Sequence, residues 1–401
     1  MKVLIATCST GEGHNGAARA IAGYLNSLNI NCEICDPLDF KSERAAARAA
    51  KIYARTIKYA PALFGAVYSL GKLYDSLPLT TPVYRANASY ADKFYAHIVN
   101  GGFDCVICTH LFAMQALTAV NRKFGCHIPS YGVLTDYVAI PFYRETELDG
   151  YFVSHEQVRE QLVKKGLPQD RIYCSGIPVS VGISACGGKQ EARNRLGIPQ
   201  EKRIISVLSG GTGCGKILKL CDRLLKTFGG QAEIYAFPAK NKRLFDKLSK
   251  KFSAYENVKI VPFTTDLPLY VASSDVVLTK AGGLSSTEIA AARVPMIHVK
   301  SIYGCETANR KYFAENGAAA YCPAVKDAVK QAAKLISDPS AAQIMRERQR
   351  ELIDPLAAEK ITRIILDCLK EETALEFFAE TSRLPEGENL SDAEMATGAA
   401  P

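Results

Sequence analysis

Residues 279–288 read TKAGGLSSTE, so an apolar strand-like run ends in a glycine pair and the start of a helix. Free backbone N–H groups at such a helix start can hold a diphosphate. Glu288 lies one turn into the expected helix and could accept hydrogen bonds from both hydroxyls of a ribose. The helix macrodipole alone would favour a glutamate there by about 0.3–1 kcal/mol. The neighbouring glycines at the end of a strand favour the ligand-binding interpretation.

Strand-like runs alternate with helical periods along most of the chain. We expect strands at 2–7, 31–36, 104–109, 130–135, 150–154, 203–208, 232–237, 257–261, 275–279 and 295–299. We expect helices at 14–28, 155–166, 214–228, 240–251, 284–293, 305–316 and 325–337. Such alternation is typical of parallel sheets with helical crossovers. The predicted fold class is α/β, with two doubly wound Rossmann-like domains facing a central cleft.

Composition divides the chain further. A small-residue stretch near residues 180–190 suits a linker, so we expect an N-terminal domain at 1–180 and a C-terminal domain at 181–370. Residues 371–401 hold eight acidic residues against one arginine, and we expect a disordered acidic tail. The whole chain has a net charge of +8, so the part before the tail is more basic still. That balance favours an anionic partner: a membrane surface, a nucleic acid or a phosphorylated substrate.

Several classes of protein are disfavoured. No apolar run reaches the roughly 18 residues of a spanning helix, and the start of the chain does not resemble a signal peptide. The thirteen cysteines therefore favour free thiols in a reducing cytosol. Two CxxC pairs, Cys32/Cys35 and Cys105/Cys108, lie in strand-like runs. Because strand residues i and i+3 face opposite sides, we expect neither pair to chelate a metal.

A basic stripe precedes a tyrosine-rich segment that ends near residue 95. It consists of Arg44, Arg48, Lys51, Arg55 and Lys58, at spacings that place them on one side of a helix opposite a largely alanine face. Such a helix would suit the surface of an anionic bilayer. An ordinary surface helix with its alanine face on the core explains the spacing about as well.

Two more glycine-rich loops follow expected strands. Residues 11–14 read GEGH, which places His14 at a helix start, where either a functional or a capping histidine fits. Residues 209–215 read SGGTGCG and include Gly211 and Thr212. Four glycines there indicate close approach to a phosphate or a tight turn. The GKS/T ending of a P-loop is missing, which disfavours a P-loop kinase or ATPase.

The sequence resembles the monogalactosyldiacylglycerol synthase and processive diacylglycerol glycosyltransferase family over about residues 1–370. The motifs occur in the family's order: GEGH at 11–14 with two alanines at 17–18, LTDY at 134–137, SGIP at 175–178, KAGG at 280–283 and TE at 287–288. The resemblance implies a GT-B fold with a UDP-sugar in the C-terminal domain and a lipid acceptor in the N-terminal domain. It also implies inversion at the anomeric carbon with no metal or other cofactor.

The resemblance further implies roles for matching residues. On the donor side, Gly282, Gly283 and Ser285 would contact the diphosphate, Glu288 the ribose and Phe263 the uracil, while Glu306 and Asn309 would face the sugar and phosphate. Lys280 could add a cation near the departing UDP. Two departures are Ala281 in place of the family's proline and Cys305 in place of a glutamine that grips sugar hydroxyls.

Asp136 matches the family's proposed base, and His14 is its rival or partner on the acceptor side of the cleft. One positioned base typically contributes about 10²–10⁴-fold to a rate. A carboxylate at its reference pKa of about 3.9 is a weak base, so partial desolvation would help Asp136.

We therefore predict an inverting hexosyltransferase that acts from a UDP-sugar onto a membrane lipid, with diacylglycerol as the expected acceptor. We expect a cytoplasmic protein, peripheral on the inner face of the plasma membrane and in contact with anionic lipid. We expect no nucleic-acid partner, because no recognised binding module accompanies the basic stripe. The alternatives are a UDP-sugar isomerase of the same fold, such as a 2-epimerase, or a non-catalytic UDP-sugar-binding protein that docks on membranes.

Overall fold

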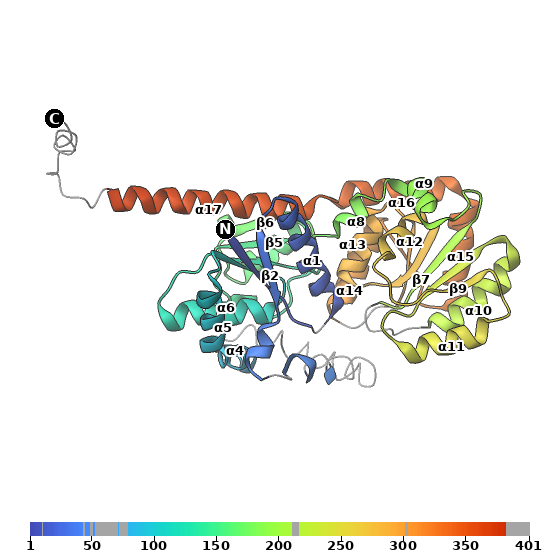
Figure 1. The fold of residues 1–401 in the computed structure, drawn as a ribbon. Helices are drawn as coiled ribbons and strands as arrows, with labels where there is room; N and C mark the ends of the chain where they lie inside the picture. The colour runs from blue at the N-terminus through green and yellow to red at the C-terminus, as the bar shows by residue number, and fades with distance from the viewer. Residues whose placement is uncertain are drawn as a thin grey trace, which may run out of the picture. The chain divides into compact units, whose positions relative to one another are not determined.

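The structure of the 401-residue chain is a computed structural model (Figure 1). It describes residues 1–9, 11–42, 45–48, 51–52, 71, 79–210, 216–300 and 304–381. The chain divides into two compact units, Met1–Ile361 and Thr362–Pro401. Helix α17 (Ala357–Thr381) runs into the segment expected to be an acidic tail, and residues 382–401 of that segment lie outside the described residues.

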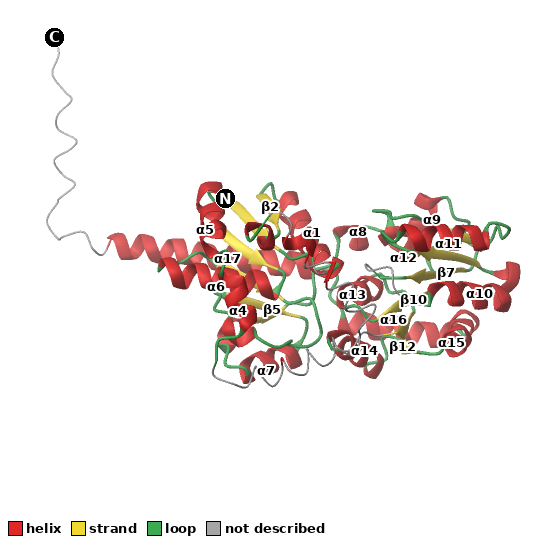
Figure 2. Ribbon diagram, turned by 90° about the horizontal axis from the view of Figure 1, so that it is seen from below, coloured by secondary structure: helices red, strands yellow, loops and turns green. Residues whose placement is uncertain are grey.

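The first sheet is formed by the N-terminal half of the chain. Its strands are β1 (Lys2–Ala6), β2 (Asn31–Cys35), β3 (Cys105–Cys108), β4 (Ser130–Val133), β5 (Gly150–Val153) and β6 (Ile172–Cys174). They are parallel and lie in the order β2-β1-β3-β4-β5-β6. Its main helices are α1 (Glu12–Ser27), α4 (Pro82–Ala88), α5 (Ala91–Gly101), α6 (Leu111–Phe124) and α7 (Glu156–Lys164). Strands β3, β4 and β5 are buried throughout, as in parallel sheets covered on both faces (Figure 2).

The second sheet is formed by the C-terminal half of the chain. Its strands are β7 (Ile204–Leu208), β8 (Glu233–Phe237), β9 (Val258–Ile260), β10 (Val276–Lys280), β11 (Met296–Lys300) and β12 (Ala320–Tyr321). They are parallel in the order β12-β11-β10-β7-β8-β9. Its helices are α10 (Ile217–Phe228), α11 (Lys242–Phe252), α12 (Leu267–Ser273), α13 (Gly283–Ala291), α14 (Cys305–Glu315), α15 (Val325–Ser337) and α16 (Pro339–Leu352). Two doubly wound parallel sheets confirm the predicted α/β class.

The segment between the two sheets is helical in part. It contains α8 (Val181–Ser184) and α9 (Gly188–Leu196). Arg193 on α9 is almost fully buried, donates from Nε to the Ser273 carbonyl oxygen at 2.9 Å, and pairs with Asp275 at 3.1 Å. The same Asp275 accepts the backbone N–H of Ile204 at 2.7 Å. This buried pair therefore fixes α9 to the beginnings of β7 and β10.

The strand orders locate one switch point in each sheet. In the first sheet the chain moves outward in opposite directions from β1 and β3, and in the second from β7 and β10. Loops at the carboxyl ends of strands on either side of such a point diverge, and ligands of open α/β sheets bind there. Thr109 follows β3, and the loops after β1 and β10 lead into the first turns of α1 and α13, which contain His14 and Gly283. Most of the loop after β7 lies outside the described residues.

The basic stripe is described only in part. Arg48 and Lys51 are exposed, whereas Ala46 is buried in the core of the N-terminal half. Arg44, Arg55 and Lys58 lie outside the described residues. Alanine packing on the core is what the ordinary surface-helix interpretation requires, and contact with a bilayer stays a prediction. Within the described ranges, no helix combines the length and apolar character needed to cross a membrane.

Candidate active site

His14 lies in the first turn of α1, at the switch point of the first sheet. Its Nδ1 is 3.0 Å from the carbonyl oxygen of Thr109 and 2.8 Å from the hydroxyl oxygen of Thr135. A carbonyl oxygen only accepts hydrogen bonds, so Nδ1 carries the proton of the first bond. In the neutral ring Nε2 then has a free lone pair. Residues that follow β3 and β4 thus hold the histidine in the tautomer in which Nε2 can accept a proton.

His14 and Asp136 shift each other's proton affinity. Burial lowers the pKa of His14, and the Asp136 carboxylate and the Thr109 carbonyl oppose that shift only partly. Burial likewise raises the pKa of Asp136, and Glu306 adds to the rise, against the hydrogen bond from Asn309 and the electrostatic effects of His14 and Lys280. Burial thus favours the unprotonated imidazole and makes the neighbouring carboxylate more basic than usual. Both features are those of a general base.

Asn309, on α14, connects this pair to the C-terminal half. The side chain is fully buried; its Nδ2 donates to Asp136 Oδ1 at 2.7 Å and its Oδ1 accepts the backbone N–H of Tyr137 at 2.8 Å. A longer bond of 3.4 Å joins Nδ2 to the carbonyl oxygen of Ala281. The amide predicted to face the donor is therefore directed at Asp136 and Tyr137. Its contact with a donor stays a prediction.

Charged side chains of the C-terminal half converge beside Asp136. Lys280, at the end of β10, forms a largely buried ion pair with Glu306 in the first turn of α14. Both residues, together with His14, act electrostatically on Asp136. Cys305 begins α14, and burial raises the pKa of its thiol, with the Asp136 and Glu306 carboxylates adding to the shift. The thiol that replaces the family's glutamine is therefore neutral.

The two glycines at the start of α13 differ in what they permit. A Cβ built at Gly283 would lie 2.2 Å from the carbonyl oxygen of Thr135 and 3.0 Å from Asp136 Oδ1. At Gly282 the nearest atom would be Lys280 Nζ, at 4.0 Å. Gly283 is therefore required for the close approach of the segment after β4. Gly282 leaves room beside Lys280 for a ligand.

The predicted ribose contact, Glu288, lies on α13 in a half-buried position. Burial raises its pKa to about 7, and Arg19 opposes that shift. Ser285, one turn earlier on the same helix, is also half-buried. A hydroxyl pair that donates to Glu288 would favour its ionised form.

Phe263 is 59% exposed, and Lys240 Nζ lies 5.0 Å from its ring centroid. Lys240 also pairs with Glu12, in the GEGH motif, at 2.6 Å. Gly211 and Thr212 lie outside the described residues. The structure thus brings His14, Asp136, Lys280, Glu306 and Asn309 into one cluster. Phe263 contributes to a neighbouring surface that Lys240 and Glu12 connect to the N-terminal half.

Sequence reasoning missed the residues that hold the predicted pair in place. Thr109 and Thr135 fix His14, and the ring of Tyr137 stacks on Tyr312 with a centroid distance of 4.4 Å. The Tyr137 hydroxyl lies 2.8 Å from that of Thr287. Thr109 follows β3, and Thr135 and Tyr137 lie in the segment after β4. The ends of the expected strands were therefore a usable sequence signal, but only the order of the strands in the sheet shows which strand ends lie close together.

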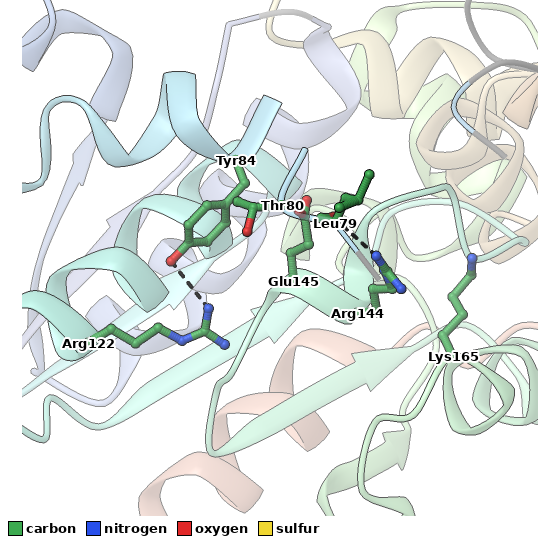
Figure 3. Close-up of a pocket in the computed structure, with 7 residues that line it drawn as sticks. All are labelled: Leu79, Thr80, Tyr84, Arg122, Arg144, Glu145 and Lys165. Atoms are coloured by element: carbon green, nitrogen blue, oxygen red, sulfur yellow. Dashed lines mark hydrogen bonds between the residues drawn. The ribbon is translucent and has the colours of Figure 1, made fainter. Parts of the chain in front are cut away.

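A separate cavity of about 400 Å³ lies in the N-terminal half (Figure 3). Its lining residues are Leu79, Thr80, Tyr84, Arg122, Arg144, Glu145 and Lys165. Arg144 donates to the Leu79 carbonyl oxygen at 3.2 Å and Arg122 to the Tyr84 hydroxyl at 3.4 Å. The buried Glu145 accepts both the N–H and the hydroxyl of Thr81 at 2.6 Å. This cavity shares no lining residue with the predicted catalytic cluster.

Solved structures with the same arrangement define the class of fold. MurG from Acinetobacter baumannii superimposes with a TM-score of 0.57 at 15% identity, over 91% of this chain and 99% of that one. A structure titled as a putative UDP-N-acetylglucosamine 2-epimerase from Listeria monocytogenes gives 0.60 at 15% identity, over 92% and 97%. The fold is therefore of the GT-B type, with two Rossmann-like domains.

Sequence comparisons narrow that class. Residues 14–179 match the model of the monogalactosyldiacylglycerol (MGDG) synthase family, and residues 204–365 match that of the glycosyltransferase family 28 C-terminal domain. Processive diacylglycerol beta-glucosyltransferases are 25% identical in Bacillus cytotoxicus, over 96% of both chains, and 24% identical in Staphylococcus carnosus, over 94% and 95%. The chain is thus similar to the family that its motifs indicate, along most of its length.

Proposed function

We propose that this protein is an inverting glycosyltransferase that transfers a hexosyl group from a UDP-sugar to diacylglycerol. One observation carries the proposal: His14 and Asp136 of the N-terminal half interact electrostatically, and Asp136 lies beside Lys280, Glu306 and the start of α13 of the C-terminal half. A base and an anion-binding turn are the two groups that such a transfer requires. The relatives are named as diacylglycerol glucosyltransferases, which supports diacylglycerol as the acceptor.

The reaction needs a proton acceptor and stabilisation of the leaving group. As the acceptor hydroxyl attacks the anomeric carbon, the bond to the UDP oxygen breaks and the hydroxyl loses its proton. Asp136 is the predicted base, and the unprotonated Nε2 of His14 is the second group that could take the proton. The departing diphosphate gains negative charge, which the N–H groups at the start of α13 and the Lys280 ammonium would stabilise. We propose that these groups suffice without a metal or other cofactor.

We further propose that the reaction takes place on the inner face of the plasma membrane, with the protein bound peripherally to anionic lipid. The exposed Arg48 and Lys51 beside the buried Ala46 support this, because the basic side of the helix is directed away from the core. Membrane attraction of this type weakens with ionic strength. Activity on vesicles with anionic lipid should therefore exceed activity on neutral vesicles and should fall as salt is added.

The direct test incubates the purified protein with a panel of UDP-sugars and diacylglycerol vesicles. We expect UDP release and a glycolipid product that both require added lipid and that Asp136→Asn reduces strongly. A parallel incubation of UDP-N-acetylglucosamine without lipid tests the isomerase alternative. An epimer in that reaction, or tight UDP-sugar binding with no turnover on any acceptor, would overturn the transferase assignment.

A further inference from the structure

Asn309 uses its amide to bind three groups from two segments of the chain. The carboxamide donates to Asp136 Oδ1 at 2.7 Å and accepts from the N–H of Tyr137 at 2.8 Å, and both partners follow β4. Its other polar contact is the carbonyl oxygen of Ala281, which follows β10. No part of the side chain is exposed. The amide is therefore already occupied by protein groups in this conformation.

We propose that Asn309 is a positioning residue: it fixes the Asp136 carboxylate beside His14 and makes that orientation depend on the docking of α14 against the segment after β4. This rests on the proposed function, because it assigns Asn309 a role in the same catalytic cluster. The bond from Asn309 occupies Oδ1, so a proton taken from the acceptor would go to the other carboxylate oxygen. A carboxamide suits the task because it donates at one atom and accepts at the other.

The charges around Asp136 make its orientation consequential. It faces the imidazole of His14 on α1, the ammonium of Lys280 on β10 and the carboxylate of Glu306 on α14. A change in the orientation of the Asp136 carboxylate would change its interactions with these three groups. The Asn309 bond holds one orientation. It also stabilises the ionised carboxylate against burial.

The segment after β4 has a second, independent hydrogen bond to the C-terminal half, this time to α13, which provides a control. The Tyr137 hydroxyl lies 2.8 Å from Thr287 Oγ1, and both residues are buried. Thr287 does not contact Asp136 in any hydrogen bond found in the described part of the chain. Thr287→Val therefore removes a different bond between the segment after β4 and the C-terminal half, and leaves the Asn309–Asp136 bond in place.

The experiment compares Asn309→Ala, Asn309→Asp and Thr287→Val with the unaltered protein. Carbon-13 NMR follows titration of the Asp136 carboxyl carbon, assigned by its absence from Asp136→Asn, and needs no turnover. We expect the midpoint to rise in Asn309→Ala, because the donor to the ionised form is lost. It should rise further in Asn309→Asp, where two carboxyls share one proton. Thr287→Val should leave it unchanged. Asn309→Asp keeps the size and the acceptor for Tyr137, so it serves if the alanine variant does not fold.

Kinetics supply the second readout. Asn309→Ala should lower kcat about 10²-fold, move the acidic limb of the pH profile to higher pH, and leave the dissociation constant for UDP within about threefold. An unshifted Asp136 midpoint in both Asn309 variants would overturn the inference. So would weakened UDP binding with an unshifted pH profile, because that is the signature of a donor contact. If the unaltered protein transfers no hexose, the proposed function fails, and the NMR titration still decides the positioning role.

Discussion

The Nδ1 atom of His14 lies 3.0 Å from the carbonyl oxygen of Thr109, and this bond crosses the switch point of the first sheet from α1 to the end of β3. The backbone at the end of one strand thereby determines which ring nitrogen of His14, about a hundred residues earlier in the sequence, carries the proton. The partner is a main-chain carbonyl oxygen, which every residue at position 109 would supply. Only a change in the backbone path would therefore remove this hydrogen bond. The tautomer of His14 is thus a property of the fold.

Substitution of His14 should affect turnover much more than donor binding. We expect His14→Gln to lower kcat by about 10²–10⁴-fold and to leave the dissociation constant for UDP nearly unchanged. Initial rates and calorimetry with UDP measure the two quantities. His127→Gln is the control, because His127 is largely exposed near Asp149. Equal losses in both variants would argue against a catalytic role.

Binding of UDP should depend on pH through Glu288. Its pKa in the free protein is about 7, and ribose hydroxyls would donate to the ionised carboxylate. The dissociation constant should therefore increase as the pH falls below about 7, by up to roughly tenfold per pH unit, and UDP binding near neutral pH should release a proton. Calorimetry in buffers of different ionisation enthalpy measures that proton. Glu288→Gln should bind more weakly and show no pH dependence over this range, unlike the exposed control Glu315→Gln.

The Glu288 carboxyl should make the free energy of unfolding fall as the pH rises, whereas a salt-bridged acid makes it increase. Its pKa is higher in the folded protein, about 7, than the ordinary value of 4.5 expected after unfolding. Folding therefore takes up a proton between these values, and the free energy of unfolding falls as the pH rises through that interval. Glu288→Gln should be more stable than the unaltered protein above pH 7, and the difference should vanish below about pH 4.5. Urea denaturation at several pH values measures this.

Substitutions at Gly282 and Gly283 should have different effects on stability, because only Gly283 is in close contact with another segment. Gly283→Ala would place a methyl group 2.2 Å from the Thr135 carbonyl oxygen, and overpacking of this kind costs about 1–3 kcal/mol. The thermal midpoint should therefore drop together with activity. Gly282→Ala has open space and should keep the thermal midpoint. A thermal midpoint that falls equally in both variants would show that close approach is not the reason for the glycine at 283.

The buried Arg193 side chain should contribute measurably to the stability of the C-terminal half. Arg193→Met leaves Asp275 paired with Lys189 but deprives the carbonyl oxygens of Ser273 and Gln200 of their donor, a loss that typically costs about 1–3 kcal/mol. The exposed Arg195 on the same helix provides the control, since Arg195→Met should change the free energy of unfolding by less than about 0.5 kcal/mol. Chemical denaturation followed by circular dichroism measures both.

Local sequence predicted most strands and several helices, but not β6 and β12 or the helices α4, α5, α6, α12 and α16. The strand expected at 275–279 is Val276–Lys280, and the helix expected at 284–293 is Gly283–Ala291, because a glycine pair marks the turn between them. The partners of His14 could not be predicted in this way. Thr109 and Thr135 meet it only because β1, β3 and β4 are neighbours, and their pairing joins segments about a hundred residues apart. The direction of the Asn309 amide likewise depends on how the two halves pack.

In this fold the strand order determines where a ligand can bind, and side chains outside the strands determine which ligand is bound. The diverging crossovers on either side of β1 and β3, and of β7 and β10, are fixed by strand order. Ala281 and Cys305 lie just after β10 and at the start of α14, outside the strand pairing of the sheet. Side chains at such positions can change between descendants of one ancestral scaffold without disturbing the pairing of the strands.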